Sequence, residues 1–210
     1  VVRGYEDVRS DQDYRSNMFD DRSLNVACHI LLSNGWNVSF ADIRCAFVQG
    51  DFYDDSTRIY IKVPELVQQI TSRTDNVLEK TWIRLRKSLY GLKDAPIQWQ
   101  RRLHRELKQV GLKQSSVDSS VWFRSEKDDE VKLGPLQQVE RILTETDTEV
   151  VAHSISGIVI IHVDDLLFGG EPEFEQMITS LLGKFGCSFK TLKEGESEGF
   201  CGRQISLHKL

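Results

Sequence analysis

One stretch constrains the fold most strongly: a β-branched apolar run that leads directly into two adjacent carboxylates. Residues 158–163 read Ile-Val-Ile-Ile-His-Val, Asp164 and Asp165 follow, and apolar residues resume at Leu166. Ile and Val favour strands, and Asp tolerates the backbone angles of a tight turn. The stretch therefore predicts an antiparallel hairpin that turns at the Asp pair.

Two carboxylates side by side at a hairpin tip repel each other, and burial raises that cost. A divalent cation would remove the repulsion, because Mg²⁺ prefers carboxylate oxygens and completes its shell with substrate phosphates. The alternative is a solvated β-turn that uses the Asp pair only for its geometry. A further carboxylate, Asp42, ends an alternating segment at residues 36–42. Three carboxylates would converge if that strand lies beside the hairpin tip.

Apolar periodicity predicts the remaining elements. Amphipathic helices are expected at residues 20–34, 95–110 and 172–185. Alternating strands are expected at residues 58–63, 82–87 and 120–123, and two closing strands at 185–192 and 199–207. The order of these elements predicts an α+β fold, in which a βαββαβ antiparallel sheet carries helices on one face.

Composition sets outer bounds on function. No apolar run approaches the roughly 20 residues that span a bilayer, so no membrane partner is expected. The opening residues resemble the middle of a strand, which suggests an excised fragment. The four cysteines show no metal-ligand spacing and are expected to be buried free thiols: Cys28, Cys45, Cys187 and Cys201.

Charge is distributed unevenly around the net value of −5. Residues 80–113 hold ten Lys and Arg against two acidic side chains. Such a segment favours phosphate binding, although a solvated basic helix face would look the same. Residues 125–150 hold eight acidic and three basic side chains with little periodicity, which predicts an exposed insertion.

Four blocks of sequence, each present once, follow one another in a recognisable order at residues 41–51, 85–99, 161–166 and 199–205. The second contains Ser-Leu-Tyr-Gly-Leu-Lys and the third Val-Asp-Asp. Together they resemble the reverse transcriptase domain of copia-type (Ty1/copia) LTR retrotransposons, over nearly the whole chain. The resemblance implies the ferredoxin-like palm of a right-hand polymerase with partial fingers. Residues 1–35 and 52–93 would be fingers-like and residues 36–51 and 94–210 palm, with thumb and RNase H absent.

By this resemblance, Asp42, Asp164 and Asp165 are the catalytic carboxylates of an RNA-directed DNA polymerase. Asp165 is expected to contribute least, and the backbone carbonyl of Ile43 would be a further metal ligand. Two Mg²⁺ ions, replaceable by Mn²⁺, would activate the primer 3′-hydroxyl and stabilise the pyrophosphate that leaves the dNTP.

The resemblance also implies contacts to the nucleotide and to nucleic acid. The Phe47 ring would exclude a nucleotide 2′-hydroxyl, and its alternative is a core aromatic. Tyr90, Gly91 and Lys93 would approach the incoming nucleotide, and their alternative is a strand-to-helix turn. The RNA template and DNA primer would meet five residues: Arg101, Arg102, Arg105, His162 and Val163.

Two positions depart from the family pattern. His162 stands where many relatives have Tyr, and its alternative is a satisfied sheet histidine. Asp94 stands where Gln is common, which would put a negative charge near nucleic acid unless Asp94 caps the following helix. The implied partners are the remaining parts of a polyprotein: thumb, RNase H and integrase. The implied location is intracellular, in cytoplasmic virus-like particles or the nucleus. Two other functions stay open: an inactive or domesticated nucleic-acid-binding module, and a metal-dependent nuclease.

Overall fold

A computed structural model describes residues 19–63, 82–125 and 155–208, and the chain divides into two compact units. The larger unit takes in residues 17–44 and 105–210, and the smaller takes in residues 1–16 and 45–104. All but the first residue of the predicted 125–150 insertion lies outside the described residues. Within the described residues, no helix is long and apolar enough to cross a bilayer.

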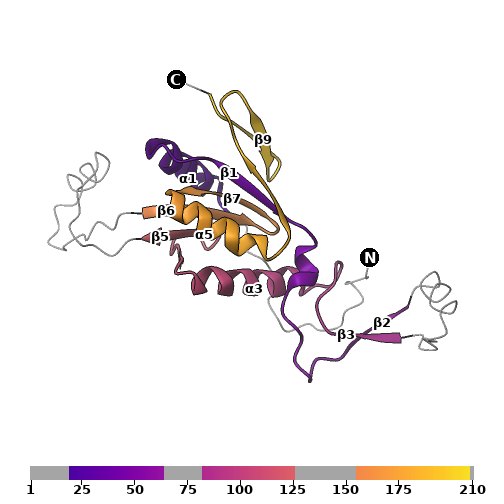
Figure 1. Cartoon of the computed structure of the whole chain (residues 1–210). Helices are drawn as coiled ribbons and strands as arrows, with labels where there is room; N and C mark the ends of the chain where they lie inside the picture. The colour runs from indigo at the N-terminus through magenta and orange to yellow at the C-terminus, as the bar shows by residue number, and fades with distance from the viewer. Residues whose placement is uncertain (1–18, 64–81, 126–154, 209–210) are drawn as a thin grey trace. The chain divides into compact units, whose positions relative to one another are not determined.

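The larger unit is built on a six-stranded antiparallel sheet in the order β4-β5-β6-β7-β1-β8 (Figure 1). Its strands are β1 (Ser39–Ile43), β4 (Lys113–Gln114), β5 (Val121–Ser125), β6 (Ile155–His162), β7 (Asp165–Gly170) and β8 (Cys187–Thr191). Nearly every side chain of β6 and β7 is buried, because both faces of these interior strands are covered. The predicted α+β class and antiparallel sheet are confirmed.

The hairpin turns one residue earlier than predicted. His162 pairs with Asp165, so Val163 and Asp164 form a two-residue turn and Asp165 already belongs to β7. Leu166 and Leu167 are completely buried on opposite faces of β7, and a one-residue slip would also move Asp165 to the other face. The prediction of a turn at the Asp pair is therefore wrong by one position.

Helices α1 (Asp21–Ser33) and α5 (Pro172–Gly183) cover opposite faces of this sheet (Figure 1). A Cβ added to Gly169 would meet Leu31 of α1, and one added to Gly170 would meet Phe174 of α5. Successive strand residues point to opposite faces, so the two helices lie on different sides. The expected one-sided arrangement therefore fails for α1, which the sequence had grouped with the fingers-like residues 1–35. The apolar stripe of α1 must be buried, and because the second face of the sheet is also apolar, the two pack against each other.

The C-terminal segment also differs from expectation. The predicted strand at residues 199–207 is a hairpin of β9 (Ser197–Phe200) and β10 (Arg203–Ser206). Its turn residues, Cys201 and Gly202, have φ of 51° and 74°. Phe200 is buried and packs against Phe40 of β1, with ring centroids 6.2 Å apart. This hairpin therefore lies over the face of the sheet that carries α1.

Three further elements lie in the smaller unit, and one helix includes residues of both units. Strands β2 (Ile59–Lys62) and β3 (Trp82–Leu85) form an antiparallel ribbon, and η2 (Ala46–Gln49) is a short 3-10 helix. Helix α3 (Ala95–Gln109) closely follows its predicted bounds, and Gly111 with φ of 87° follows its end. These strand and helix predictions are confirmed.

The packing of α5 gives a stability prediction. A Cβ at Gly157 would lie 2.2 Å from the buried ring of Phe174, so Gly157→Ala should reduce the unfolding free energy by about 1–3 kcal/mol. At Gly183 nothing lies within 4 Å, so Gly183→Ala should be neutral or stabilise by up to about 1 kcal/mol. Urea unfolding of both variants measures the difference, and equal midpoints would contradict the packing.

Candidate active site

One cross-strand row of side chains lies at the end of the sheet where the hairpin turns. His162 pairs with Asp165, Asp165 with Asp42, and Asp42 with Ser188. Directly opposed residues place their side chains on the same face of a sheet. The register of β1 therefore makes neighbours of two carboxylates that are far apart in the sequence.

The hairpin tip is fastened to β1 by backbone contact. The Ile43 N–H donates to the carbonyl oxygen of Asp164 over 3.0 Å. Val163, the other turn residue, has φ of 57°, a left-handed conformation that is unfavourable for a β-branched side chain. Strain of this kind persists only where the surrounding structure enforces it. Here the buried strands on both sides and the bond to Ile43 hold the turn.

The negative charges of the row act on one another. Burial raises the pKa of the Asp165 carboxyl, and the nearby charges of Asp164 and Asp42 raise it further, while His162 acts in the opposite direction. Asp165 and Asp164 are half-buried and Asp42 is exposed. The three carboxylates thus share one electrostatic environment, although Asp42 and Asp165 are the pair brought face to face.

Whether these residues fit a metal ion depends on donor chemistry and on placement. Carboxylate oxygens are the donors that Mg²⁺ and Mn²⁺ favour, and the mutual repulsion at Asp165 is a charge that a cation would neutralise. Within the described residues, however, no three His, Cys, Asp or Glu side chains form a cluster that could hold a metal. The carboxylates are therefore chemically suited to Mg²⁺ or Mn²⁺, but within the described residues the predicted three carboxylates do not form a ready metal site.

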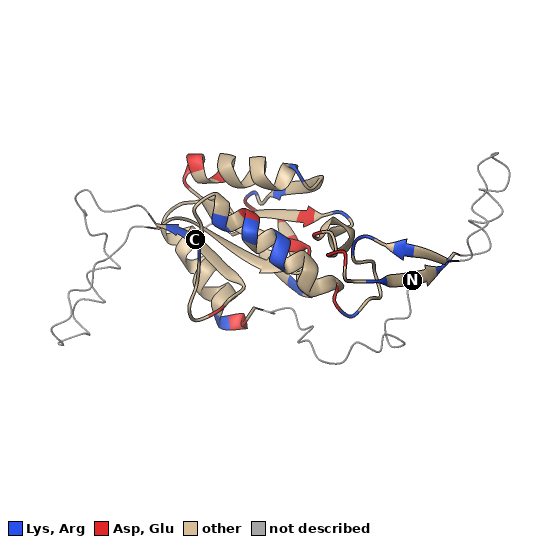
Figure 2. Ribbon diagram, turned by 90° about the horizontal axis from the view of Figure 1, so that it is seen from below, with Lys and Arg blue, Asp and Glu red and all other residues tan. Residues whose placement is uncertain are grey.

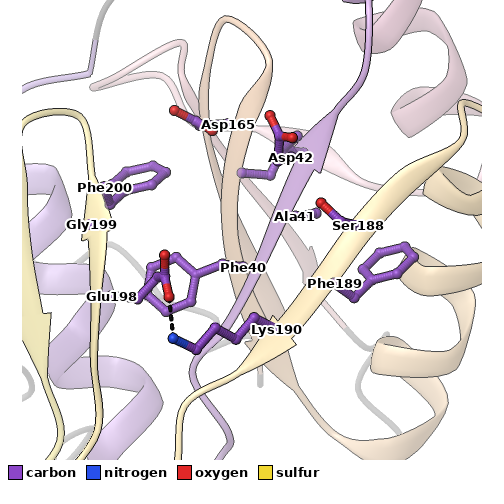
Figure 3. A pocket seen from close by; sticks show the side chains of 11 residues that line it. Phe40, Ala41, Asp42, Asp165, Ser188, Phe189, Lys190, Glu198, Gly199 and Phe200 are labelled. Carbon is purple, nitrogen blue, oxygen red and sulfur yellow. Dashed lines mark hydrogen bonds and ion pairs between the residues drawn. The ribbon is translucent and has the colours of Figure 1, made fainter.

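A pocket of about 250 Å³ opens beside the row (Figure 3). Asp42 and Asp165 lie at one end, Phe40 and Phe200 form an apolar wall, and Lys190 lies at the other end. The ammonium of Lys190 is paired with the carboxylate of Glu198, which ties β8 to the β9–β10 hairpin. The pocket therefore combines aromatic surface with carboxylates at one end.

Two thiols border the carboxylates. Burial raises the pKa of Cys201 to about 12, and the charges of Asp165 and Asp164 add to that shift. Burial also raises the pKa of Cys187, and Asp42 contributes. Both therefore stay protonated at neutral pH. The expectation of four buried thiols is wrong, because Cys45 is exposed in the turn after β1 and the other three are only partly buried.

His162 sits in an aromatic setting at the end of the row. Its ring meets the edge of Phe19 at 5.6 Å between centroids, and Phe19 stacks on Phe200 at 5.5 Å. The buried Nδ1 of His162 has no hydrogen-bond partner within the described part of the chain. The alternative of a satisfied sheet histidine is therefore not supported for that nitrogen.

The predicted nucleotide contacts form a second group, in the smaller unit. The rings of Phe47 and Tyr90 lie 4.8 Å apart, and the buried Ser88 hydroxyl donates to the Phe47 carbonyl over 2.8 Å. Gly91 has φ of 96°, which favours glycine there, and Lys93 is exposed. Phe47 is therefore held through both its backbone and its ring, at an aromatic contact that remains partly open.

Asp94 and the basic residues of α3 have distinct surroundings. The buried Asp94 carboxylate accepts a hydrogen bond from the Tyr53 hydroxyl at 2.9 Å, so its charge is not directed at solvent. Arg101, Arg105 and Lys108 are exposed at helical spacing and form a basic stripe (Figure 2). Arg102 instead lies 3.4 Å from Asp51 and is only partly exposed.

Several residues of these sites were not singled out from sequence. Phe19 and the Lys190–Glu198 pair carry no motif signal of their own. Ser88 lies inside a recognised block, and its position before Leu-Tyr-Gly was the available signal. The ion pair joins two strands whose pairing partners could not be deduced, so no pattern would have found it.

Comparisons with known proteins place the chain beside reverse transcriptases. A family described as "Reverse transcriptase (RNA-dependent DNA polymerase)" matches residues 1–153. The chain is 29% identical over 163 residues to the retrovirus-related Pol polyprotein from transposon RE2 of Arabidopsis thaliana, and 29% over 125 residues to that from transposon RE1. These alignments cover 75% and 58% of this chain but only 10% and 8% of the relatives. The predicted family is confirmed, and the matched residues contain the first two of the four sequence blocks.

The crowded charges give a pH prediction. Folding raises the pKa of Asp165, so protonation of this carboxyl favours the folded state. The stability gained in this way is fully present below the ordinary pKa of 3.8 and is lost as the pH rises through the raised pKa. Asp165→Asn should therefore raise the melting temperature at pH 7 in metal-free buffer and change it little at pH 3.

Asp118 provides a control of opposite sign. Burial acts to raise its pKa, but hydrogen bonds from Ser23, Asp20 and Ser120 lower it overall. Asp118→Asn should therefore destabilise the fold at pH 7 and less so at pH 3. Thermal melts at both pH values check the pair, and a lower melting temperature for Asp165→Asn at pH 7 would contradict the crowding.

Proposed function

The chain belongs to the reverse transcriptase (RNA-dependent DNA polymerase) family, and on this premise we propose that it transfers nucleotides from dNTPs to a primer on an RNA template. The observation that carries the proposal is the row in which Asp42 faces Asp165 beside the hairpin turn. The chain spans about a tenth of the length of its curated relatives. That this chain itself catalyses nucleotide transfer is therefore proposed and is not taken over from those relatives.

The strand order supports assigning the larger unit to a polymerase palm. Taken along the chain, β1, α3, β6, β7, α5 and β8 have the ferredoxin-like βαββαβ order, although only residues 105–109 of α3 belong to the larger unit. The corresponding strands lie in the sheet as β6-β7-β1-β8, with β5 and β4 added at one edge. We assign the β2–β3 ribbon of the smaller unit to the fingers.

Asp42, Asp164 and Asp165 would hold divalent ions, Mg²⁺ or Mn²⁺, with the Ile43 carbonyl as a further ligand. Bound there, the ions would act as Lewis acids toward the primer hydroxyl and the nucleotide phosphates. The chain itself supplies the carboxylates on adjacent strands, and β1 lies between β7 and β8, which limits its movement. Preorganised charge of this kind is the main contribution of a protein to phosphoryl transfer.

The second group of residues would select the nucleotide. Phe47 is held by Ser88 at its backbone and by Tyr90 at its ring, so it can present a fixed aromatic edge to the sugar. Gly91 and Lys93 would approach the base and the phosphates. The basic stripe of α3 would bind template–primer phosphates. The partners would be the other parts of an intracellular polyprotein.

Primer extension tests the proposed reaction. Asp42→Asn and Asp164→Asn should each reduce dNTP incorporation by at least about 10²–10³-fold, because each removes charge from the metal site. Glu173→Gln is the matched control, since this exposed carboxylate lies on α5, on the opposite face of the sheet from Asp42. Incorporation by the variants equal to wild type, or none by wild type, would overturn the proposal.

A parallel reaction without nucleotides separates the other functions. Labelled primer–template with Mg²⁺ but no dNTP should stay intact. Degradation that Asp164→Asn abolishes would assign the carboxylates to a nuclease instead. Nucleic-acid binding without incorporation or cleavage would assign the chain to the inactive binding class.

Sugar selection gives a separate prediction. Phe47→Ala should leave dNTP incorporation within about tenfold and raise the use of rNTP relative to dNTP by about tenfold or more, because one lost steric contact changes discrimination by 1–3 kcal/mol. Ser88→Ala should produce a smaller change in the same direction. Competitive incorporation of dNTP and rNTP measures both, and unchanged discrimination in Phe47→Ala would exclude the gate.

A further inference from the structure

The β2–β3 ribbon has two chemically different faces. Pairing aligns Tyr60 with Arg84 and Lys62 with Trp82, so these four side chains share one face. The alternate residues Ile59, Ile61, Ile83 and Leu85 form the other face and are half-buried. The apolar face is thus partly covered, and the first face is turned outward.

Two large aromatic rings dominate the outward face. Tyr60 is 52% exposed and Trp82 57% exposed, which is unusual for side chains of this size. They lie diagonally across the two strands, where Cα atoms are about 7–8 Å apart. We call this surface the Tyr60/Trp82 face. Two such rings on a regular scaffold form a rigid platform for flat ligands.

Cations surround the two rings. Lys62 lies on the Tyr60/Trp82 face, and the exposed Arg58 and Arg86 lie just beyond the ends of the two strands. Arg84 is tied into the preceding loop, where it donates to the carbonyls of Asp55 and Thr57 at 3.1 Å. In the ribbon and at its ends, residues 58–63 and 82–87, the basic side chains outnumber the acidic ones. The surface therefore attracts polyanions.

We propose that the Tyr60/Trp82 face binds an unpaired nucleic-acid strand, whose bases stack on the two rings while its phosphates meet the neighbouring cations. Aromatic platforms beside basic residues bind single strands in this way, and a duplex offers no free base faces. A protein partner would use the apolar area of the rings but would not require the cations. The charge therefore favours nucleic acid.

The inference rests on the proposed function for the identity of the strand, which would be unpaired template. The binding step itself requires neither the carboxylates nor nucleotides. Asp164→Asn should therefore bind a single strand as wild type does while failing in primer extension. This variant separates failure of the platform from failure of the polymerase.

Fluorescence anisotropy with a labelled single-stranded oligonucleotide in EDTA tests the platform. Tyr60→Leu/Trp82→Leu keeps apolar area but removes the aromatic faces, and affinity should fall about 10- to 100-fold. Tyr60→Phe/Trp82→Phe keeps the ring faces and should bind within about threefold of wild type. Both variants should fold, because the half-buried apolar face of the ribbon is unchanged, and circular dichroism melts check this.

Salt dependence provides an independent readout. Each phosphate contact contributes about 0.7 to the slope of log K against log salt for single strands. Lys62→Gln should therefore reduce the slope by about 0.7, whereas the Leu double variant should lower affinity without changing the slope. Unlabelled duplex should compete poorly.

Three outcomes would overturn the inference. Wild type could fail to bind, or the Leu double variant could bind as tightly as wild type. Equal loss in the Leu and Phe double variants would show that stacking is not the interaction. If the Leu variant keeps its affinity but elutes as a smaller species than wild type, the face is a protein contact instead.

Discussion

The antiparallel placement of β1 between β7 and β8 is the constraint on which the rest of the larger unit depends. Five residues of β1 align with β8 and four with β7. The same register that buries Ala41 and Ile43 on one face puts Asp42 opposite Asp165 on the other. A slip of one residue would bury the carboxylate and expose the core, so packing itself specifies the row.

The row destabilises the fold locally, and the stability of the surrounding core offsets this. The pKa of Asp165 is raised, and Val163 holds an unfavourable backbone angle within the same hairpin. Both features persist because the adjoining strands are completely buried at Leu166, Leu167 and Ile160. Proteins concentrate such strain and charge where chemistry takes place. The hairpin tip therefore has the energetic profile of a functional site.

Sequence patterns predicted this fold wherever the signal is local. The amphipathic stripe of α5 and the alternation of β2 were readable, as was the β-branched run of β6. The turn at Val163 was missed because a β-branched residue there violates turn preferences, and tertiary packing overrides them. The second face of the sheet was missed because β7 is apolar at every position after Asp165, so alternation cannot reveal which helix covers which side. Cross-strand partners such as Lys190 and Glu198 depend on register, which no local pattern encodes.

Residues 45–104 of the smaller unit come between β1 and the last residues of α3 in the sequence, and this order has a consequence during synthesis. Strand β1 leaves the ribosome well before β7 and β8, its two partners. Until they arrive, β1 carries unpaired N–H and C=O groups along both edges, the state most prone to pair with another chain. Nascent chains of this protein should therefore depend on chaperones until the last strands of the sheet are made.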